Sequence, residues 1–260
     1  MSLQQIVAIK GYIQTTYLAV YPDKLLLLDA GCYSDVEKII SYITETLNRP
    51  LDQLKLVMVT HMHPDHAGGA KRLQQLTGCQ IATAAHYKPW YNGVTGKLSH
   101  LNDLMLTYYV ANRQGKHLTY LWYNPKMKAD LYVHDGDTIP NFDDWQVLST
   151  AGHTDRDISL WHKETRQVYV ADLILKIKAK FVSPFLITLP YVYRESVTKI
   201  RDLQPDTVIL AHGGFEKLVK EDYNEIIAKA PQKPRKMTIL HSIGIMRSQL
   251  SFGRKRAQTP

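Results

Sequence analysis

Short runs of apolar and β-branched residues recur along the chain, each about as long as a buried strand and bounded by polar turn residues. They predict strands over residues 6–9, 16–20, 25–28, 56–59, 80–83, 145–148, 158–161, 167–170 and 207–210. Apolar residues at helical spacing predict helices over residues 34–47, 67–76, 194–203 and 221–230. Ser34, with Glu37 three residues later, has the spacing of a capping box that would begin the first helix. Strands interspersed with helices indicate a layered α/β fold, and the hairpin-like strand pairs before each helix argue against a simple doubly wound sheet.

One segment differs from the rest in composition. Residues 87–132 hold 9 of the 20 Trp and Tyr residues of the chain. We expect an insertion here that lies over a site as a lid or pocket wall. The alternative is a helical insertion whose aromatic side chains pack on one another.

The net charge of +8 is concentrated at the C-terminus. All 24 acidic residues lie at or before Glu225, and eight basic residues follow it, so residues 1–225 are formally neutral. We therefore expect one domain over 1–230 and a basic tail over 231–260. A solvated tail is favoured over one that contacts nucleic acid or an anionic surface.

Membrane and secretion signals are absent from the sequence pattern. No apolar run approaches the roughly 20 residues that span a bilayer, and the N-terminus lacks the basic and apolar regions of a signal peptide. Two cysteines, Cys32 and Cys79, do not form a disulfide framework. We expect a reduced, cytoplasmic protein without a transmembrane segment.

The strongest chemical signal is the string HMHPDHAGG at residues 61–69, directly after a predicted strand. His61 and His63 are two residues apart, so in an extended segment their imidazoles leave on the same side, which suits joint binding of one metal ion. Asp65 and His66 follow at a turn favoured by Pro64 and are placed to serve a second ion. The two glycines that follow let a helix begin close to the site without a Cβ in the way.

Three further predicted strands end in a similar manner. They lead to His153, Asp172 and His212 within the strings AGHT, AD and AHGG. Functional groups gather at the carboxyl ends of strands in layered α/β folds. The sequence therefore predicts a metal site built from several strand ends.

These strings match the H-x-H-x-D-H motif and the later markers of the metallo-β-lactamase superfamily, which the chain resembles over about residues 10–215. The resemblance implies an αβ/βα four-layer sandwich carrying the aromatic-rich insertion and the basic C-terminal tail. It also implies two metal ions, one held by His61, His63 and His153 and the other by Asp65, His66 and His212, with Asp172 bridging both. Asp29, in the string LDAG, matches a family residue that supports the site from behind.

Imidazole and carboxylate ligands with open positions favour zinc, and iron or manganese remain alternatives. A hydroxide between two such ions would be the nucleophile at neutral pH. Asp65 and Asp172 are the catalytic candidates, so replacing either with Ala should abolish turnover. We expect a hydrolase that attacks an ester, lactone or thioester of a small, apolar substrate.

The ligand set excludes some branches of the superfamily. Class B β-lactamases generally place a cysteine where Asp172 stands, and oxygen-reducing diiron members carry glutamate in place of His63. Acyl-homoserine lactonases and glyoxalase II enzymes are similar to this chain in all seven ligands. Leu175 replaces a tyrosine of some lactonases, which leaves the proton donor unassigned. Tyr191 and Tyr193 are candidates for that role, and each is equally consistent with packing.

Two other functions stay open. One is a phosphodiesterase or nuclease, consistent with the basic tail, and the other is a non-catalytic metal-binding regulatory protein. Residues 155–157 are interpreted either as substrate contacts or as a solvated turn. The remaining histidines belong to no matched motif, so we expect no metal at His86, His100, His117, His134, His162 or His241.

Overall fold

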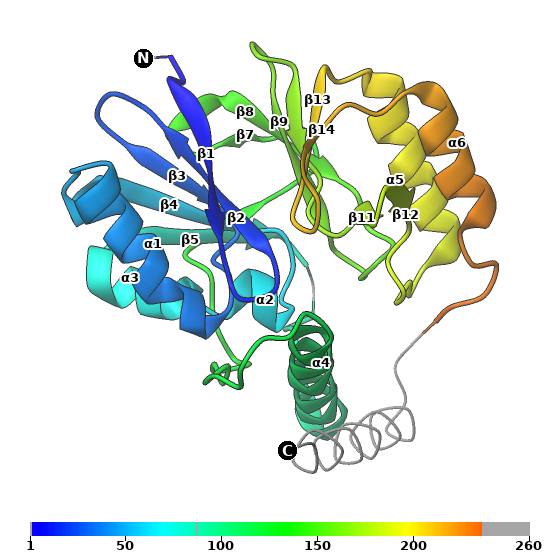
Figure 1. Cartoon of the computed structure of the whole chain (residues 1–260), viewed down its shortest axis with the longest axis horizontal. Coiled ribbons are helices and arrows are strands. Elements are labelled where there is room, and N and C mark those ends of the chain that lie inside the picture. The colour runs from blue at the N-terminus through cyan, green and yellow to red at the C-terminus, as the bar shows by residue number, and fades with distance from the viewer. Residues whose placement is uncertain (1, 87, 236–260) are drawn as a thin grey trace, which may run out of the picture.

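The computed structural model describes residues 2–86 and 88–235, and its core is a pair of six-stranded sheets that face each other (Figure 1). The first sheet has the order β1-β2-β3-β4-β5-β6, and the second has the order β14-β13-β10-β9-β8-β7. The strands of the first sheet are β1 (Gln5–Lys10), β2 (Thr15–Val20), β3 (Leu25–Leu28), β4 (Leu54–Val59), β5 (Gln80–Ala84) and β6 (Leu131–Val133). Those of the second are β7 (Thr138–Ile139), β8 (Phe142–Ser149), β9 (Ile158–His162), β10 (Gln167–Tyr169), β13 (Thr207–Leu210) and β14 (Gly214–Glu216). A separate hairpin pairs β11 (Leu175–Ile177) with β12 (Lys180–Val182).

Helices cover the outer face of each sheet (Figure 1). The first sheet carries η1 (Tyr33–Asp35), α1 (Val36–Ser41), η2 (Tyr42–Thr46), η3 (Leu51–Gln53), α2 (Pro64–Ala67) and α3 (Ala70–Thr77) on its side of the molecule. The second carries α5 (Pro190–Leu203) and α6 (Lys220–Lys229). This arrangement confirms the predicted αβ/βα sandwich.

The alternation of side chains along each strand explains the layers. In β3, Leu26 and Leu28 pack between the two sheets, together with Trp145 of β8. Leu25 and Leu27 of the same strand point the other way, into the cluster that α1 and α3 cover. Because both faces of the strand are buried, its sequence is a continuous apolar run rather than an alternating one.

Within the first sheet the chain turns from hairpins to parallel strands. β1, β2 and β3 are antiparallel neighbours, whereas β3, β4, β5 and β6 run parallel. In the second sheet only β10 and β13 are parallel, and the other neighbours are antiparallel. The mixture agrees with the hairpin-like pairs in the sequence and with the absence of a doubly wound sheet.

Each predicted strand and helix region is found, but several details were wrong. The helix expected over 67–76 begins at Ala70, because Gly68 and Gly69 separate it from the short α2. Ser34 does not cap the first helical segment, and its buried hydroxyl has no partner among the described residues. The Asp35 carboxylate instead accepts a hydrogen bond from Cys32 N–H at 2.9 Å. Both cysteines are buried and free.

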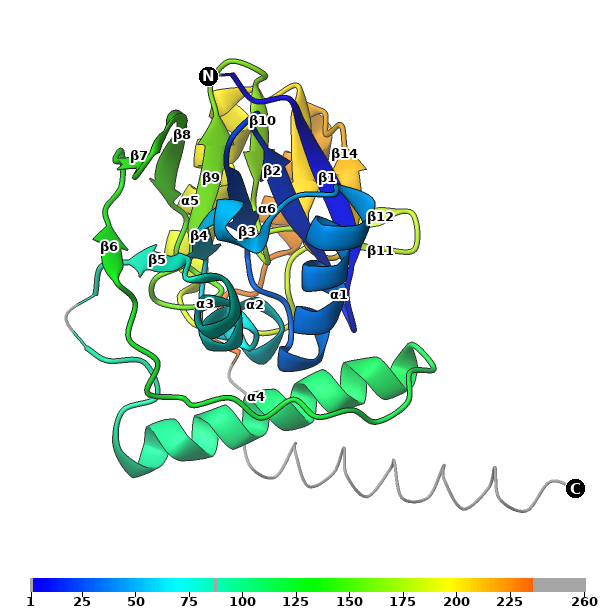
Figure 2. The ribbon, with the colours of Figure 1, turned by 90° about the vertical axis from the view of Figure 1, so that its left-hand side faces the viewer.

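The aromatic segment contains a long helix, α4 (Gly93–Arg113), which lies outside the two sheets and runs past the end of the molecule where α2 lies (Figure 2). Leu104 and Ala111 attach α4 to the body through a small apolar cluster with Ile13 and Cys32. No helix in residues 2–235 is both long and apolar enough to cross a bilayer. The predicted tail lies outside the described residues from position 236 onwards.

Candidate metal centre

The HMHPDH segment turns sharply where β4 ends. Pro64 occupies the first turn of α2, a position where its missing N–H costs nothing, and α2 presents Asp65 and His66. A Cβ on Gly69 would lie 2.5 Å from the carbonyl oxygen of Ala30. The glycine pair is therefore needed for the close approach of this segment to the loop after β3.

The other three candidate ligands follow strands of the second sheet. His153 comes after β8, Asp172 after β10 and His212 after β13. The loop that carries His153 contains Gly152 at φ 142°, where a Cβ would lie 2.4 Å from the Cα of Tyr193 in α5. Only glycine allows this loop to lie so close to the helix.

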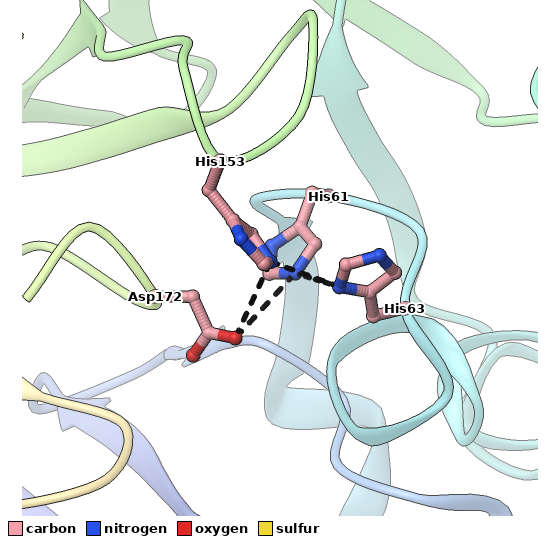
Figure 3. A group of neighbouring side chains, drawn as sticks. All are labelled: His61, His63, His153 and Asp172. Atoms are coloured by element: carbon pink, nitrogen blue, oxygen red, sulfur yellow. Dashed lines mark hydrogen bonds and ion pairs between the residues drawn. The ribbon is translucent and has the colours of Figure 1, made fainter. Parts of the chain in front are cut away.

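One group of side chains contains His61, His63, His153 and Asp172, whose ligand atoms all lie within 4.8 Å of one another (Figure 3). His61 Nε2 is 2.9 Å from His63 Nδ1, and His153 Nε2 is 3.1 Å from the same atom. Asp172 Oδ2 lies 3.6 Å from His153 Nε2 and 4.0 Å from His61 Nε2. Three nitrogens and one carboxylate oxygen thus converge on one point.

A second group of the same kind contains Asp65, His66 and His212. His212 Nε2 lies 3.3 Å from Asp65 Oδ2. The other oxygen of Asp172, Oδ1, faces this group, at 3.2 Å from His66 Nε2 and 3.4 Å from His212 Nε2. The two oxygens of Asp172 therefore each face one group, which is the geometry of a bridging carboxylate.

Hydrogen bonds on the far side of the imidazoles fix which ring nitrogen faces the centre. His66 Nδ1 is 2.7 Å from Asp29 Oδ2, and His153 Nδ1 is 2.7 Å from the carbonyl oxygen of Leu186. Both partners only accept hydrogen bonds, so each Nδ1 carries a proton and Nε2 is the ring nitrogen that faces the centre. Asp29 is fully buried and lies behind His66, on the side of the ring away from the centre.

Burial and neighbouring charges shift the protonation of these groups in opposite directions. Burial and the nearby imidazoles lower the pKa of His61 well below its ordinary value, and that of His63 to about 3. Burial alone would lower the pKa of His66, but Asp172, Asp29 and Asp65 raise it well above 6.5. Burial would raise the pKa of Asp172, but His66 and His212 hold it well below 3.8. Carboxylates buried at this density require positive charge among them.

These residues fit divalent cations. Among the described residues, two buried atoms at the centre, His66 Nε2 and Asp172 Oδ1, have no hydrogen-bond partner. An unpaired buried polar atom is costly, and a cation between these atoms would satisfy both. Five imidazoles with two carboxylates form a donor set suited to zinc and similar ions.

The centre opens into a cavity of about 1200 Å³. His63, Asp65, His153, Asp172 and His212 line one part of it. The remaining wall comes from the loop between β1 and β2, from α4, from the β11–β12 hairpin region and from Arg235. A volume of this size accommodates a small organic substrate.

Several sequence-based candidates lie elsewhere. Tyr193 is buried and donates a hydrogen bond to the carbonyl oxygen of Leu173, and Tyr191 is exposed, so neither lines the cavity. Arg156 stacks on Trp90 with its guanidinium carbon 4.5 Å from the ring centroid. The buried Asp157 accepts hydrogen bonds from Thr154 beside His153. The segment 155–157 is therefore neither a cavity wall nor a fully solvated turn.

The insertion does form part of the cavity wall through α4, as expected, but its aromatic side chains contribute little to that wall. Tyr91, Trp122 and Tyr123 surround the buried His100, with ring centroids 4.8–5.0 Å from its imidazole. From the described aromatic residues of 87–132, only Tyr109 lines the cavity. His162 pairs with Asp144 at 2.9 Å. Neither metal-compatible group includes His86, His100, His117, His134 or His162, and His241 lies outside the described residues.

Sequence reasoning missed Asp103, an acidic side chain of α4 that lines the same cavity. Its Oδ2 accepts a hydrogen bond from the hydroxyl of Tyr91 at 2.8 Å. Burial raises the pKa of Asp103 to about 7, although the Tyr91 hydrogen bond and His153 oppose the shift. The position could not be found without knowing where α4 lies, because no motif surrounds Asp103.

Comparison with known proteins agrees with this fold and centre. The model of the metallo-beta-lactamase superfamily matches residues 9–212, and the chain belongs to that superfamily. It is similar to the "Probable metallo-hydrolase YflN" of Bacillus subtilis (strain 168), with 24% identity over 216 residues that cover 74% of this chain and 76% of that protein.

Two solved structures share the fold. ST1585 from Sulfolobus tokodaii, an archaeal member of the superfamily, has a TM-score of 0.63 at 20% identity and covers 96% of both chains. TTHA1429 from Thermus thermophilus has a TM-score of 0.65 at 18% identity, covering 86% of this chain and 78% of that chain.

Proposed function

We propose that the protein is a binuclear metal-dependent hydrolase that cleaves a carboxylic ester, lactone or thioester of a small molecule. The observation that carries this proposal is Asp172, whose two oxygens each face one cluster of imidazoles at the floor of the cavity. His61, His63 and His153 would hold one ion, and Asp65, His66 and His212 the other, with zinc as the best match to the ligands. When bound, the ions supply a water that is activated at neutral pH and polarise the scissile carbonyl.

The chain's own residues orient these groups. The carboxylate of Asp29 and the carbonyl of Leu186 hold His66 and His153 with Nε2 toward the cavity. Gln14 donates a side-chain hydrogen bond to the carbonyl oxygen of Asp65 and so fixes the turn that carries it. These contacts hold the ligands in position before substrate arrives, so little reorganisation is needed during the reaction.

Asp103 supplies the proton that the leaving group requires. It lies on the wall of the same cavity, on an element separate from the ligands. Its carboxyl oxygen Oδ1 is not occupied by the Tyr91 hydrogen bond, which reaches Oδ2. A carboxyl group held partly protonated near neutral pH is suited to general acid catalysis, and this role replaces the tyrosine that Leu175 cannot provide.

A rate comparison on zinc-loaded protein tests the proposal. We expect an aryl ester or a lactone to be cleaved at least tenfold faster than bis(p-nitrophenyl) phosphate. Asp65→Ala should abolish turnover while the circular dichroism spectrum stays that of the folded chain. Ester cleavage that is unchanged in Asp65→Ala, or that persists after chelation of the metal, would overturn it.

A phosphodiesterase is the second candidate, because six basic residues line the cavity. Faster cleavage of bis(p-nitrophenyl) phosphate than of every ester and lactone would favour it. The first candidate is preferred because the cavity wall also carries Leu106, Tyr109, Val110 and Phe185, which suit an apolar acyl chain.

A further inference from the structure

The wall of the cavity away from the centre is rich in positive charge. The basic residues that line it come from four separate segments of the chain: Lys10, Arg113, Lys116, Lys176, Lys178 and Arg235. Residues 1–225 are neutral as a whole. The concentration of positive charge at this cavity is therefore a property of the fold and does not follow from composition.

Acidic side chains do not neutralise this charge. Lys176 pairs with Glu216 at 2.6 Å, but none of the other five has an ion-pair partner within residues 2–235. Of the acidic residues that line the cavity, Asp65 and Asp172 belong to the two histidine clusters, and Asp103 accepts a hydrogen bond from Tyr91. Four of the basic residues, including Lys10 and Arg113, are exposed, which places them at the mouth while the clusters lie at the floor.

The residues of α4 that line the cavity change in chemical character along the helix. Asp103, Leu106, Val110 and Arg113 line the cavity at intervals of three and four residues, which is the spacing of one helix face. The stripe begins with the acid, continues through apolar residues and ends with a guanidinium group. Ten residues of helix measure about 15 Å at 1.5 Å per residue. The acidic and basic ends of the wall are therefore separated by the length of a medium-sized molecule.

We infer that the substrate is an amphiphilic anion, in which an apolar chain separates the ester or thioester bond from a carboxylate or phosphate group that the basic mouth of the cavity binds. This inference rests on the proposed hydrolase function and adds the class of substrate. The apolar chain would lie along Leu106 and Val110, and the anionic end would reach Arg113, whose planar guanidinium suits both carboxylate and phosphate oxygens. This class of substrate adds an anionic group to the small, apolar substrate expected from the sequence.

Matched substrate pairs test the inference on the zinc-loaded full chain. The first pair is the mono-p-nitrophenyl ester of decanedioic acid and the same ester with its far carboxyl capped as a methyl ester. The second is the butyryl thioester of 8-mercaptooctyl phosphate and that of 8-mercaptooctanol. The first pair tests a carboxylate on the acyl chain, and the second tests a phosphate on the leaving group.

We expect about a tenfold higher kcat/KM for the anionic member of at least one pair at low ionic strength, falling as salt screens the mouth. The double variant Arg113→Gln/Lys116→Gln should reduce that ratio to about threefold or less. Lys97→Gln is the matched control, because Lys97 is an exposed cation of the same helix outside the cavity wall. It should leave the ratio unchanged.

The possible failures are distinguishable. Equal rates within both pairs, with clear hydrolysis of all four compounds, would overturn the inference and leave the hydrolase function intact. If no ester or thioester is cleaved, the proposed function fails, and calorimetric binding of octyl sulfate against octanol then tests the basic mouth alone. Tighter, salt-sensitive binding of the sulfate that weakens in the double variant would support it, and equal binding would overturn it. Preferential cleavage of oligonucleotides would also overturn it.

Discussion

Replacing Asp29 with Asn should change the tautomer of His66 and so weaken one metal site. The carboxylate accepts hydrogen bonds from Thr60 N–H at 2.8 Å on Oδ1, and from Tyr169 OH and His66 Nδ1, both at 2.7 Å, on Oδ2. Asn tolerates the left-handed backbone at this position, where φ is 63°. If its oxygen keeps the bond to Thr60 N–H, its NH2 group replaces Oδ2.

The hydroxyl of Tyr169 can rotate to accept from that NH2 group, but a protonated Nδ1 of His66 cannot. The imidazole therefore takes its other tautomer, with the proton on Nε2, the atom that faces Asp172 Oδ1 at 3.2 Å. A protonated Nε2 has no lone pair for a metal ion. Changes to such supporting carboxylates typically weaken metal binding about 10- to 100-fold, and the lost charge-assisted hydrogen bond costs about 2 kcal/mol of unfolding free energy.

Zinc titration against a competing chromophoric chelator measures the affinity of each of the two zinc-binding steps, one for each cluster of ligands. We expect one step to weaken by about 10- to 100-fold while the step assigned to His61, His63 and His153 changes little. Asp144→Asn is the matched control, because Asp144 also joins a buried histidine, His162, at 2.9 Å and lies outside both clusters. It should lower the stability of the chain and leave both zinc affinities intact. Unchanged zinc affinities in Asp29→Asn, or equal weakening of both steps, would refute this reasoning.

Three further perturbations follow from the same structure. Asp103→Asn should lower kcat for alkyl esters, whose leaving groups need a proton, by about 100-fold or more, yet hardly affect p-nitrophenyl esters; equal losses on both would contradict the acid role. Burial raises the pKa of Asp35 from 3.8 to about 6, so the folded chain binds the proton more tightly than the unfolded chain and loses stability as pH rises between these values. In urea unfolding, the stability of Asp35→Asn relative to wild type should rise by about 2 kcal/mol from pH 4 to 6.5, and parallel pH profiles would contradict this. Gly152→Ala, with its Cβ 2.4 Å from Tyr193 Cα, should cost about 3 kcal/mol or more, against about 1 kcal/mol for Gly78→Ala, where nothing lies within 4 Å; similar losses in thermal unfolding would refute the steric argument.

The fold was predictable to the extent that local pattern determines it. Each apolar run that predicted a strand forms one, and several of them, such as β3 and β9, are buried on both faces. Short strands such as β6, β7 and β11 were missed, since two or three residues carry no periodicity. At the start of the first helical segment, the hydrogen bond comes from the Asp35 carboxylate and not from the Ser34 hydroxyl. This choice depends on the loop before the helix, where the absence of a Cβ on Gly31 leaves room for the carboxylate of Asp35.

The candidate ligands were predictable because they lie in compact strings at strand ends. The cavity wall could not be predicted, because its residues are far apart in the sequence and none of them belongs to a recognisable motif. Lys10 and Arg113 are separated by more than 100 positions, and a basic residue in a polar segment is ordinarily a solvated one. The aromatic residues of the insertion were misassigned for a related reason, since composition does not reveal whether Tyr91 and Trp122 face a substrate or pack on the buried His100.

The metal ligands and the basic mouth of the cavity are anchored to different parts of the fold. This difference explains why the ligands do not identify the substrate. The ligands follow β4 of one sheet and β8, β10 and β13 of the other, so their positions depend on the large apolar core between the sheets. The basic mouth instead belongs to α4, the end of β1, the β11–β12 hairpin and Arg235, and the apolar cluster around Leu104 that anchors α4 is separate from the core between the sheets. Substitutions in the mouth can therefore alter what is bound without disturbing the centre, and relatives with the same seven ligands need not share a substrate. A search for the natural substrate should accordingly hold the scissile ester constant and vary the charge and distance of the group at the far end.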